Sequence, residues 1–216
     1  VGGLCRQEGP RFRVVGPEEG LPLRRILCLL EDAGGTLWVG GSEGLFRREG
    51  GRFLPVGELE GRGWIDDLTQ DSQGALWVAI RDAGLWRREP GGSFEEMRVP
   101  GQDFSSGRLL SHSDGTLYAS GDHGLSRYHR GVWTTWTPAD GLADDDVYFL
   151  AEDREGRIWL SYHSSRGVTR FDGQGFRTFT LRDGLHHMAV YSIGADARGN
   201  VWLGTAHPLR WSRPPC

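Results

Sequence analysis

Three histidines are spaced so that they could share one site. His123, His163 and His207 follow one another at intervals of about forty residues, each just after a short apolar run. Imidazoles brought together in this way can ligate a metal ion or contact a polar ligand. No His-x-Glu motif and no pair of carboxylates at ligand spacing accompanies them, so we predict no metal site. Contacts to a polar ligand and solvent-exposed turns remain the two alternatives.

Two further patterns resemble chemical motifs. Residues 40–44 read Gly-Gly-Ser-Glu-Gly, which fits the Gly-x-Ser-x-Gly turn of serine hydrolases, and residues 144–146 are three consecutive aspartates. The hydrolase turn requires a strand-to-helix junction with Asp and His partners, and a calcium loop requires alternating acidic ligands. We therefore interpret Ser42 as a turn residue without a catalytic role, and the aspartates as a solvated acidic turn.

The segments that carry these residues belong to an internal repeat. Five segments share a turn glycine followed three residues later by an aromatic residue, and these glycines are Gly35, Gly74, Gly115, Gly156 and Gly199. An Asp stands three residues before the glycine in every copy except the third, which has His112. A second mark, Gly-Leu or a close variant followed by Arg, comes about ten residues after the glycine. A repeat of about forty residues is typical of a propeller.

Each period contains four short segments that favour β-strands. In the fourth period they are residues 147–152, 157–160, 167–171 and 175–180, and a turn at 153–156 joins the first two. Four antiparallel strands in about forty residues are typical of one propeller blade. We predict an all-β fold, a single β-propeller domain over residues 1–216 with four-stranded antiparallel blades.

The two ends of the chain determine how this propeller closes. Residues 1–16 supply the last two strands of a blade, and residues 190–211 supply the first two and a further strand-like segment at Pro208-Leu209. If the N- and C-terminal strands pair, with residues 11–15 completing the last blade, five blades form a closed ring without exposed edges. The alternative is a slice of a larger, seven-bladed propeller.

The repeated residues have structural roles in this interpretation. The repeated Asp is expected to accept hydrogen bonds from backbone N–H groups of its turn. The repeated aromatic residues are expected to pack between blades, because one blade cannot bury its own faces; they are Trp38, Trp77, Tyr118, Trp159 and Trp202.

Function is therefore expected in the turns that depart from the repeat. Two sets of turns meet around one end of a propeller, and here they combine aromatic, Arg, His and acidic side chains. Such a mixture suits stacking on, and hydrogen bonding to, a sugar or another polar ligand. The candidate ligand-binding residues are Arg25, Trp64, Arg81, Asp122, His123, Asp146, Tyr162, His163, His187 and His207. We assign no catalytic residue.

Composition excludes several classes of protein. The 34 glycines argue against a helix-dominated fold. The 25 basic residues, all Arg, and 29 acidic residues give a net charge of −4 without a basic stripe, so we expect no nucleic-acid partner. No apolar run is long enough for a transmembrane helix. Three cysteines without metal-type spacing predict neither zinc nor a disulfide framework, and no cofactor is expected.

The repeat resembles a known family. Glu-Asp-x-x-Gly-x-Leu-Trp-Val-Gly, then Gly-Leu, Phe-x-x-Phe-Thr and Asp-Gly-Leu, is similar to the two-component regulator propeller repeat, and the resemblance runs from Gly3 to Trp211. It implies a periplasmic or otherwise extracytoplasmic sensor domain of bacterial hybrid histidine kinases and related receptors. It also implies an attached signalling module in the parent chain, carbohydrate fragments as ligands, and no shared catalytic motif.

We accordingly predict a non-catalytic sensor domain that binds a small polar ligand or a partner and does not itself insert into a membrane. One alternative is a propeller enzyme, of the lyase or metal-dependent lactonase type, acting at the mouth of the channel. A second is a structural module that self-associates, for example as a homodimer. The first residue is Val and no signal peptide is recognisable, so we expect a piece cut from a longer protein.

Overall fold

The structure, a computed structural model, describes residues 3–22 and 24–205. These residues form four complete four-stranded antiparallel sheets and two two-stranded sheets. The two-stranded sheets are β1 (Leu4–Glu8) with β2 (Arg11–Val15), and β19 (Val190–Ala195) with β20 (Val201–Thr205). The four blades comprise β3 (Ile26–Glu31), β4 (Leu37–Gly41), β5 (Gly44–Glu49) and β6 (Arg52–Pro55); β7 (Ile65–Gln70), β8 (Leu76–Ile80), β9 (Gly84–Arg88) and β10 (Phe94–Met97); β11 (Arg108–Ser111), β12 (Leu117–Gly121), β13 (Gly124–His129) and β14 (Val132–Trp136); and β15 (Val147–Glu152), β16 (Ile158–Tyr162), β17 (Val168–Phe171) and β18 (Phe176–Phe179).

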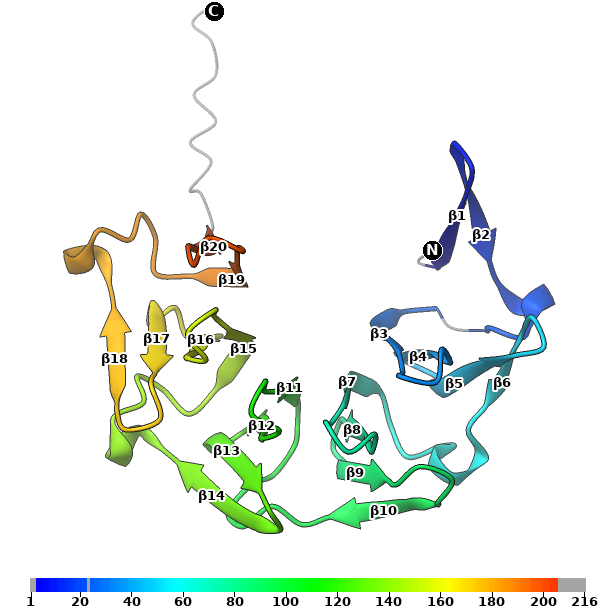
Figure 1. Cartoon of the computed structure of the whole chain (residues 1–216), viewed down its shortest axis with the longest axis horizontal. Coiled ribbons are helices and arrows are strands. Elements are labelled where there is room, and N and C mark those ends of the chain that lie inside the picture. Colours follow the sequence, from blue (N-terminus) through cyan, green and yellow to red (C-terminus); the bar gives the residue numbers. More distant parts are fainter. Residues whose placement is uncertain (1–2, 23, 206–216) are drawn as a thin grey trace, which may run out of the picture.

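The blades are arranged around a common centre as an open arc (Figure 1). Within each blade the strands follow one another in chain order from the inside to the outside, so β3, β7, β11 and β15 are innermost. Neighbouring innermost strands contact one another along the arc, and β19 continues the series. The prediction of an all-β propeller fold with four-stranded antiparallel blades is confirmed.

The closed five-bladed ring is not what the structure shows. Among the described residues, β2 pairs only with β1, and β19 and β20 pair only with each other, so residues 11–15 do not complete the last blade. The two hairpins lie at opposite ends of the arc (Figure 1). A count of half-blades tells which strands each end lacks, but it does not determine that the two ends meet in space. The alternative prediction, a slice of a larger propeller, agrees with this arrangement. The segment at Pro208-Leu209 lies outside the described residues.

The hydrophobic core lies between consecutive blades. Trp77 of β8 is fully buried, and its ring contacts Tyr128 and Trp133 of the next blade at centroid distances of 5.2 and 6.3 Å. Tyr118 of β12 contacts Phe171 of the following blade in the same way, at 6.4 Å. The repeated aromatic position therefore joins one blade to the next, as predicted.

The repeated aromatic residue becomes more exposed towards the C-terminal end of the arc. Trp38 is buried and Trp159 is half-buried, stacked on Phe179 at 5.4 Å. Trp202 of β20 is 65 % exposed. No described strand covers that side of β20, so its packing role is not fulfilled within the described residues.

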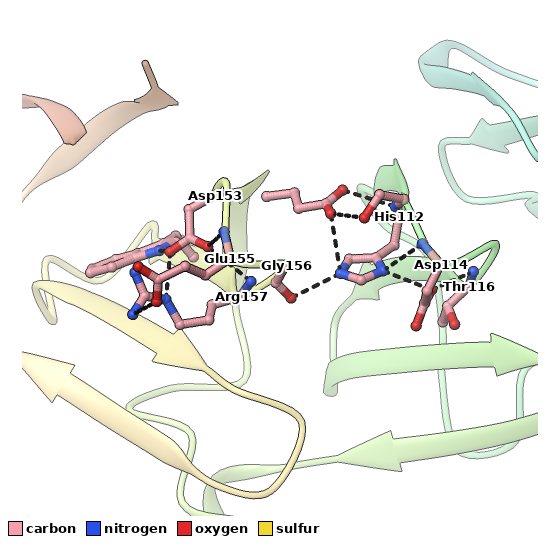
Figure 2. A network of polar contacts seen from close by, with 10 residues as sticks. His112, Asp114, Thr116, Asp153, Glu155, Gly156 and Arg157 are labelled. Atoms are coloured by element: carbon pink, nitrogen blue, oxygen red, sulfur yellow. Dashed lines mark hydrogen bonds and ion pairs between the residues drawn. The ribbon is translucent and has the colours of Figure 1, made fainter. Parts of the chain in front are cut away.

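The repeated Asp fixes both its turn and the repeated Trp. In the fourth blade, Oδ1 of Asp153 accepts hydrogen bonds from the backbone N–H groups of Glu155 and Arg157, each at 3.0 Å (Figure 2). Oδ2 accepts a hydrogen bond from Nε1 of Trp159 at 2.7 Å. The equivalent Asp–Trp bonds measure 2.8 to 2.9 Å in the other three copies that have both residues. The predicted role of the Asp in its turn is confirmed, and its bond to the indole is an addition.

The connections between blades contain short 3-10 helices at the Asp-Gly-Leu mark. Thr137 and Asp140 form a reciprocal capping box around one of them, and Thr180 and Asp183 form the same box around another. Gly141 follows the first with a φ of 108°, a conformation that favours glycine. These caps give the two connections that carry them a fixed shape.

Candidate functional site

The turns between the second and third strands lie at the same end of every blade as the blade-to-blade connections. The backbone N–H of Arg81 donates to the carbonyl of Trp64 at 2.8 Å, and that of His163 donates to the carbonyl of Asp146 at 3.2 Å. Each of these bonds joins a turn to the start of the innermost strand of its own blade. We call this end of the blades the loop face.

Trp64 holds two guanidinium groups on the loop face. The Cζ atom of Arg81 lies 4.8 Å from the centroid of the Trp64 ring, and that of Arg25 lies 5.6 Å from it. Both distances are in the range of cation–π attraction. Three predicted site residues from two blades are therefore brought together.

Arg81 is held in place by a buried carboxylate. Its Nη2 donates to Oδ1 of Asp66 at 2.5 Å and its Nε donates to Oδ2 at 3.2 Å. Asp66 is only 2 % exposed, so the guanidinium covers it. The bidentate bond raises the pKa of Arg81 and fixes the plane of its guanidinium.

Arg108, at the start of β11, extends this group to the next blade. Its Nη1 donates to the backbone carbonyl of Asp66 at 3.0 Å, and its Nε donates to that of Tyr148 at 3.3 Å. Its Cζ lies 5.8 Å from the centroid of the Tyr148 ring. Asp67 lies nearby, and its burial raises the pKa of its carboxyl although the N–H groups of Leu109 and Leu68 donate to it.

Aromatic side chains continue the row towards β19. The ring of Tyr148 meets the imidazole of His163 edge-on, with 4.5 Å between the ring centroids. It also meets the ring of Tyr191 edge-on, with 6.4 Å between the centroids. Nδ1 of His163 lies 2.8 Å from Oδ1 of Asp146, and Tyr191 is 58 % exposed. We call the row that these contacts create the inner rim, and its members are Arg25, Trp64, Arg81, Arg108, Tyr148 and Tyr191.

Half of the inner rim was missed by the sequence analysis, because it lies in the innermost strands and not in the turns. The pairing register shifts by one residue at the start of β3, β7, β15 and β19, a sign of a β-bulge. Bulges re-aim side chains and are frequent beside functional sites. The bulged residues are Leu27, Asp66, Tyr148 and Tyr191. The sequence carries one signal for these bulges: each bulged residue follows a buried or half-buried Ile or Val at the start of its strand.

Two predicted residues lie on the loop face away from the rim. The carboxylate of Asp122 accepts hydrogen bonds from the N–H and the hydroxyl of Ser105, at 2.9 and 2.5 Å. The exposed imidazole of His123 lies 3.7 Å from the carboxylate of Asp103. Asp122 lines a cleft of about 780 Å³ between the second and third blades, where the guanidinium of Arg62 covers the ring of Trp86 at 4.2 Å.

Two other predicted residues, Tyr162 and His187, are not available on the rim. Tyr162 is in the core, and its hydroxyl accepts a hydrogen bond from the N–H of Ala143 at 3.3 Å. Nδ1 of His187 accepts a hydrogen bond from the N–H of Ala189 at 3.0 Å within its own loop. His207 lies outside the described residues.

The motif-like patterns take part in local hydrogen bonds. Ser42 lies between two strands, where its hydroxyl donates to Glu43 at 2.7 Å and accepts from the N–H of Arg25 at 3.2 Å. The carboxylate of Asp144 accepts from the Ser164 hydroxyl and the Arg166 guanidinium, and these bonds outweigh burial and lower its pKa to about 2. Within residues 3–22 and 24–205, no three His, Cys, Asp or Glu side chains are grouped as metal ligands.

A second cleft, of about 670 Å³, lies between the first and second blades at the end opposite the loop face. Its walls include Asp32, Trp38 and Arg88, which belong to the repeated turn and to its inter-blade packing. These three residues therefore have structural roles in the repeat.

These observations define a contiguous set of propeller blades with an arginine- and aromatic-rich loop face. The family described as two component regulator propeller matches the sequence at residues 20–43, 141–164 and 184–207. These repeats are two-component regulator propeller repeats. No protein of curated function matches the chain.

Solved structures share the fold. The extracellular domain of the hybrid two component system BT3049 from B. thetaiotaomicron has a TM-score of 0.75 at 20% identity, over 94% of this chain and 30% of that one. PorZ, a surface component of the type-IX secretion system of Porphyromonas gingivalis, has a TM-score of 0.70 at 13% identity, over 94% and 35%. Virginiamycin B lyase from Staphylococcus aureus has a TM-score of 0.67 at 15% identity, over 90% and 67%. This chain thus spans about a third of the first two proteins.

None of the helices in the described part of the chain has the length and apolar character needed to cross a bilayer.

Proposed function

We propose that this chain is a non-catalytic, ligand-binding part of the extracytoplasmic sensor propeller of a bacterial signal-transduction receptor. The inner rim is its ligand site, and a signalling module in the parent chain responds to it. The family of the repeats and the extracellular domain of BT3049 support the sensor role.

The observation that carries the ligand site is the continuity of the inner rim. Five successive innermost strands and the turns beside them bring cations and aromatic faces into one row, from Arg25 through Trp64 to Tyr191. Such a row offers stacking surfaces and hydrogen-bond donors together, as a small polar ligand such as a carbohydrate fragment requires. Arg81 and Arg108 are already fixed by Asp66, so little side-chain entropy is lost when a ligand binds.

A second candidate function, catalysis at the loop face, is favoured by one observation. Nδ1 of His163 faces the carboxylate of Asp146 at 2.8 Å, an arrangement that orients a general base. Virginiamycin B lyase has the same fold, and a structure of its H270A variant is described as catalytically inactive. Here the imidazole also lies against Tyr148, which gives it a packing role without catalysis.

Calorimetric titration with cellotriose and tri-galacturonate tests the proposal, followed by mass spectrometry of the recovered sugar. A sensor binds at least one probe and returns it unchanged, and Tyr148→Ala weakens the binding. Cleavage or elimination of the probe, lost in His163→Ala, would show an enzyme instead. Absence of binding by both probes contradicts a carbohydrate ligand at the inner rim.

A further inference from the structure

Among the three arginines of the inner rim, only Arg81 has a carboxylate partner in the described part of the chain. Arg81 is matched by Asp66, at 2.5 Å. Among the described residues, the guanidinium of Arg25 has no carboxylate within ion-pair distance, and its contact is the face of Trp64. Arg108 donates to two backbone carbonyls and to no carboxylate oxygen in the described part of the chain.

The acidic groups beside this row accept hydrogen bonds from other groups. The carboxylate of Asp67, whose pKa burial raises, accepts from the N–H groups of Leu68 and Leu109, at 2.9 Å each. Glu43, in the turn that faces Arg25, accepts hydrogen bonds from the Arg24 N–H and the Ser42 hydroxyl, at 2.9 and 2.7 Å. The carboxylate of Asp146 faces His163. Arg25 and Arg108 therefore have no carboxylate as an ion-pair partner among the described residues, although the whole chain has a net charge of −4.

Trp64 keeps two of these guanidinium groups close together. Two guanidinium groups repel one another, and the ring attracts both, at 4.8 and 5.6 Å from its centroid. Arg81 cannot turn away, because Asp66 holds it through two bonds. Arg25 is exposed and keeps its N–H donors turned to solvent or ligand. Asp66 occupies the Nε and Nη2 donors of Arg81, so an anion beside this pair receives charge-assisted hydrogen bonds mainly from the planar fork of Arg25, the geometry that suits a carboxylate.

We propose that Arg25, Trp64 and Arg81 form an anion subsite that binds the carboxylate of a ring-shaped ligand, whose ring lies along the rim towards Tyr148 and Tyr191. This inference rests on the proposed function and adds the charge of the ligand to it. Tyr191 is the exposed aromatic surface at the far end of the row, and Arg108 joins the two ends through its contacts with Asp66 and Tyr148. The ring that bears the carboxylate is that of a uronate sugar or that of an aromatic acid.

The test compares each acid with a neutral partner of nearly the same shape. Tri-galacturonate is titrated beside its methyl ester, and benzoate beside benzamide, at low and high salt. The acid of at least one pair is expected to bind about tenfold or more tightly than its neutral partner, since charged hydrogen bonds discriminate strongly. Raising the salt is expected to weaken this binding. The pair that shows the preference identifies the sugar or the aromatic ring as the source of the carboxylate.

Two adjacent arginines provide a matched pair of variants. Arg25→Gln is expected to weaken the acid about tenfold and to leave its neutral partner unchanged. Arg24→Gln removes the same charge one residue away, where no contact with Trp64 is recorded among the described residues, and is expected to change the affinity less than about twofold. Because both side chains are exposed, both variants are expected to unfold at the temperature of the parent.

The outcomes separate this inference from the proposed function. Equal or tighter binding of the neutral partners overturns the anion subsite and leaves a ligand-binding sensor standing. Equal effects of the two Arg variants also overturn it, because they would show a general charge effect. Absence of binding by all four probes, with cellotriose also inactive, contradicts the proposed function as well.

Discussion

Oδ2 of Asp71 accepts a hydrogen bond from the indole N–H of Trp77 at 2.8 Å, while Oδ1 of the same carboxylate accepts from the N–H groups of Gln73 and Ala75 at 3.0 and 2.9 Å. One side chain thus shapes a turn and positions the ring that packs against the next blade. Because Trp77 is fully buried, its N–H has no water to replace a lost acceptor.

Asp71→Ala is expected to destabilise the chain by about 3 kcal/mol, the cost of three orphaned donors, one of them buried. Asp196→Ala is the matched control, since Asp196 makes the same bonds to its turn and to Trp202. Trp202 is exposed, so water replaces the lost acceptor and we expect a loss of about 1 kcal/mol. Urea unfolding of both variants measures the difference, and equal losses would show that burial of the indole does not matter.

His112 takes the place of this Asp in the third blade and faces acceptors on both ring nitrogens (Figure 2). Nδ1 lies 2.7 Å from Oδ1 of Asp114, and Nε2 lies 2.9 Å from the carbonyl of Gly156 in the next blade and 3.4 Å from Oε1 of Glu152. Burial alone would lower the pKa of His112, but the Gly156 carbonyl, Asp114 and Glu152 together outweigh it and raise the pKa above 6.5.

A raised pKa in the folded state means that protonated His112 stabilises the fold. This contribution is fully present below the ordinary value of 6.5 and is lost as the pH rises through the higher folded value. The free energy of unfolding of the parent, minus that of His112→Gln, is therefore expected to fall as the pH rises from 6.5 through the folded pKa. Urea titrations across this range measure it. A difference that is constant or increases with pH would contradict the assignment.

Gly124, at the start of β13, shows where the repeat requires glycine. Its φ is 103°, and a Cβ placed there would lie 2.1 Å from the carbonyl oxygen of Trp136. Gly44, the equivalent residue of the first blade, also has a positive φ, but its Cβ would meet nothing within 4 Å. We expect Gly124→Ala to cost about 4 kcal/mol and Gly44→Ala about 1 kcal/mol. Thermal unfolding compares them, and equal losses would show that the backbone conformation alone sets the cost.

The fold was predictable from the sequence because its period is carried by local rules. The Asp-to-Gly turn and the aromatic residue after it recur wherever one blade must pack on the next, and strands 147–152 and 168–171 lie where the pattern placed them. Closure was not predictable, because it depends on where two distant hairpins lie in space. Their residues satisfy local pairing equally well in an open arc.

The candidate site was predictable only where it lies in turns. Arg25, Trp64 and Arg81 come together because their turns lie at one end of neighbouring blades. His123 and His163 interact with different carboxylates, Asp103 and Asp146, and no contact between them is recorded in the described part of the chain. Asp66, Tyr148 and Tyr191 depend on one-residue bulges in the innermost strands, and a bulge changes the direction of a side chain without changing the apolar pattern around it.

The indole N–H signal of Trp64 in a two-dimensional ¹H–¹⁵N spectrum is the most direct test that the inner rim binds ligand. Its assignment comes from its loss in Trp64→Phe, and cellotriose and tri-galacturonate are the probes. We expect at least one probe to shift this signal in a saturable manner, while the indole signal of Trp38, at the opposite end of the blades, stays unchanged. Shifts confined to Trp38, or no shift of Trp64 with either probe, would contradict a carbohydrate site at the inner rim.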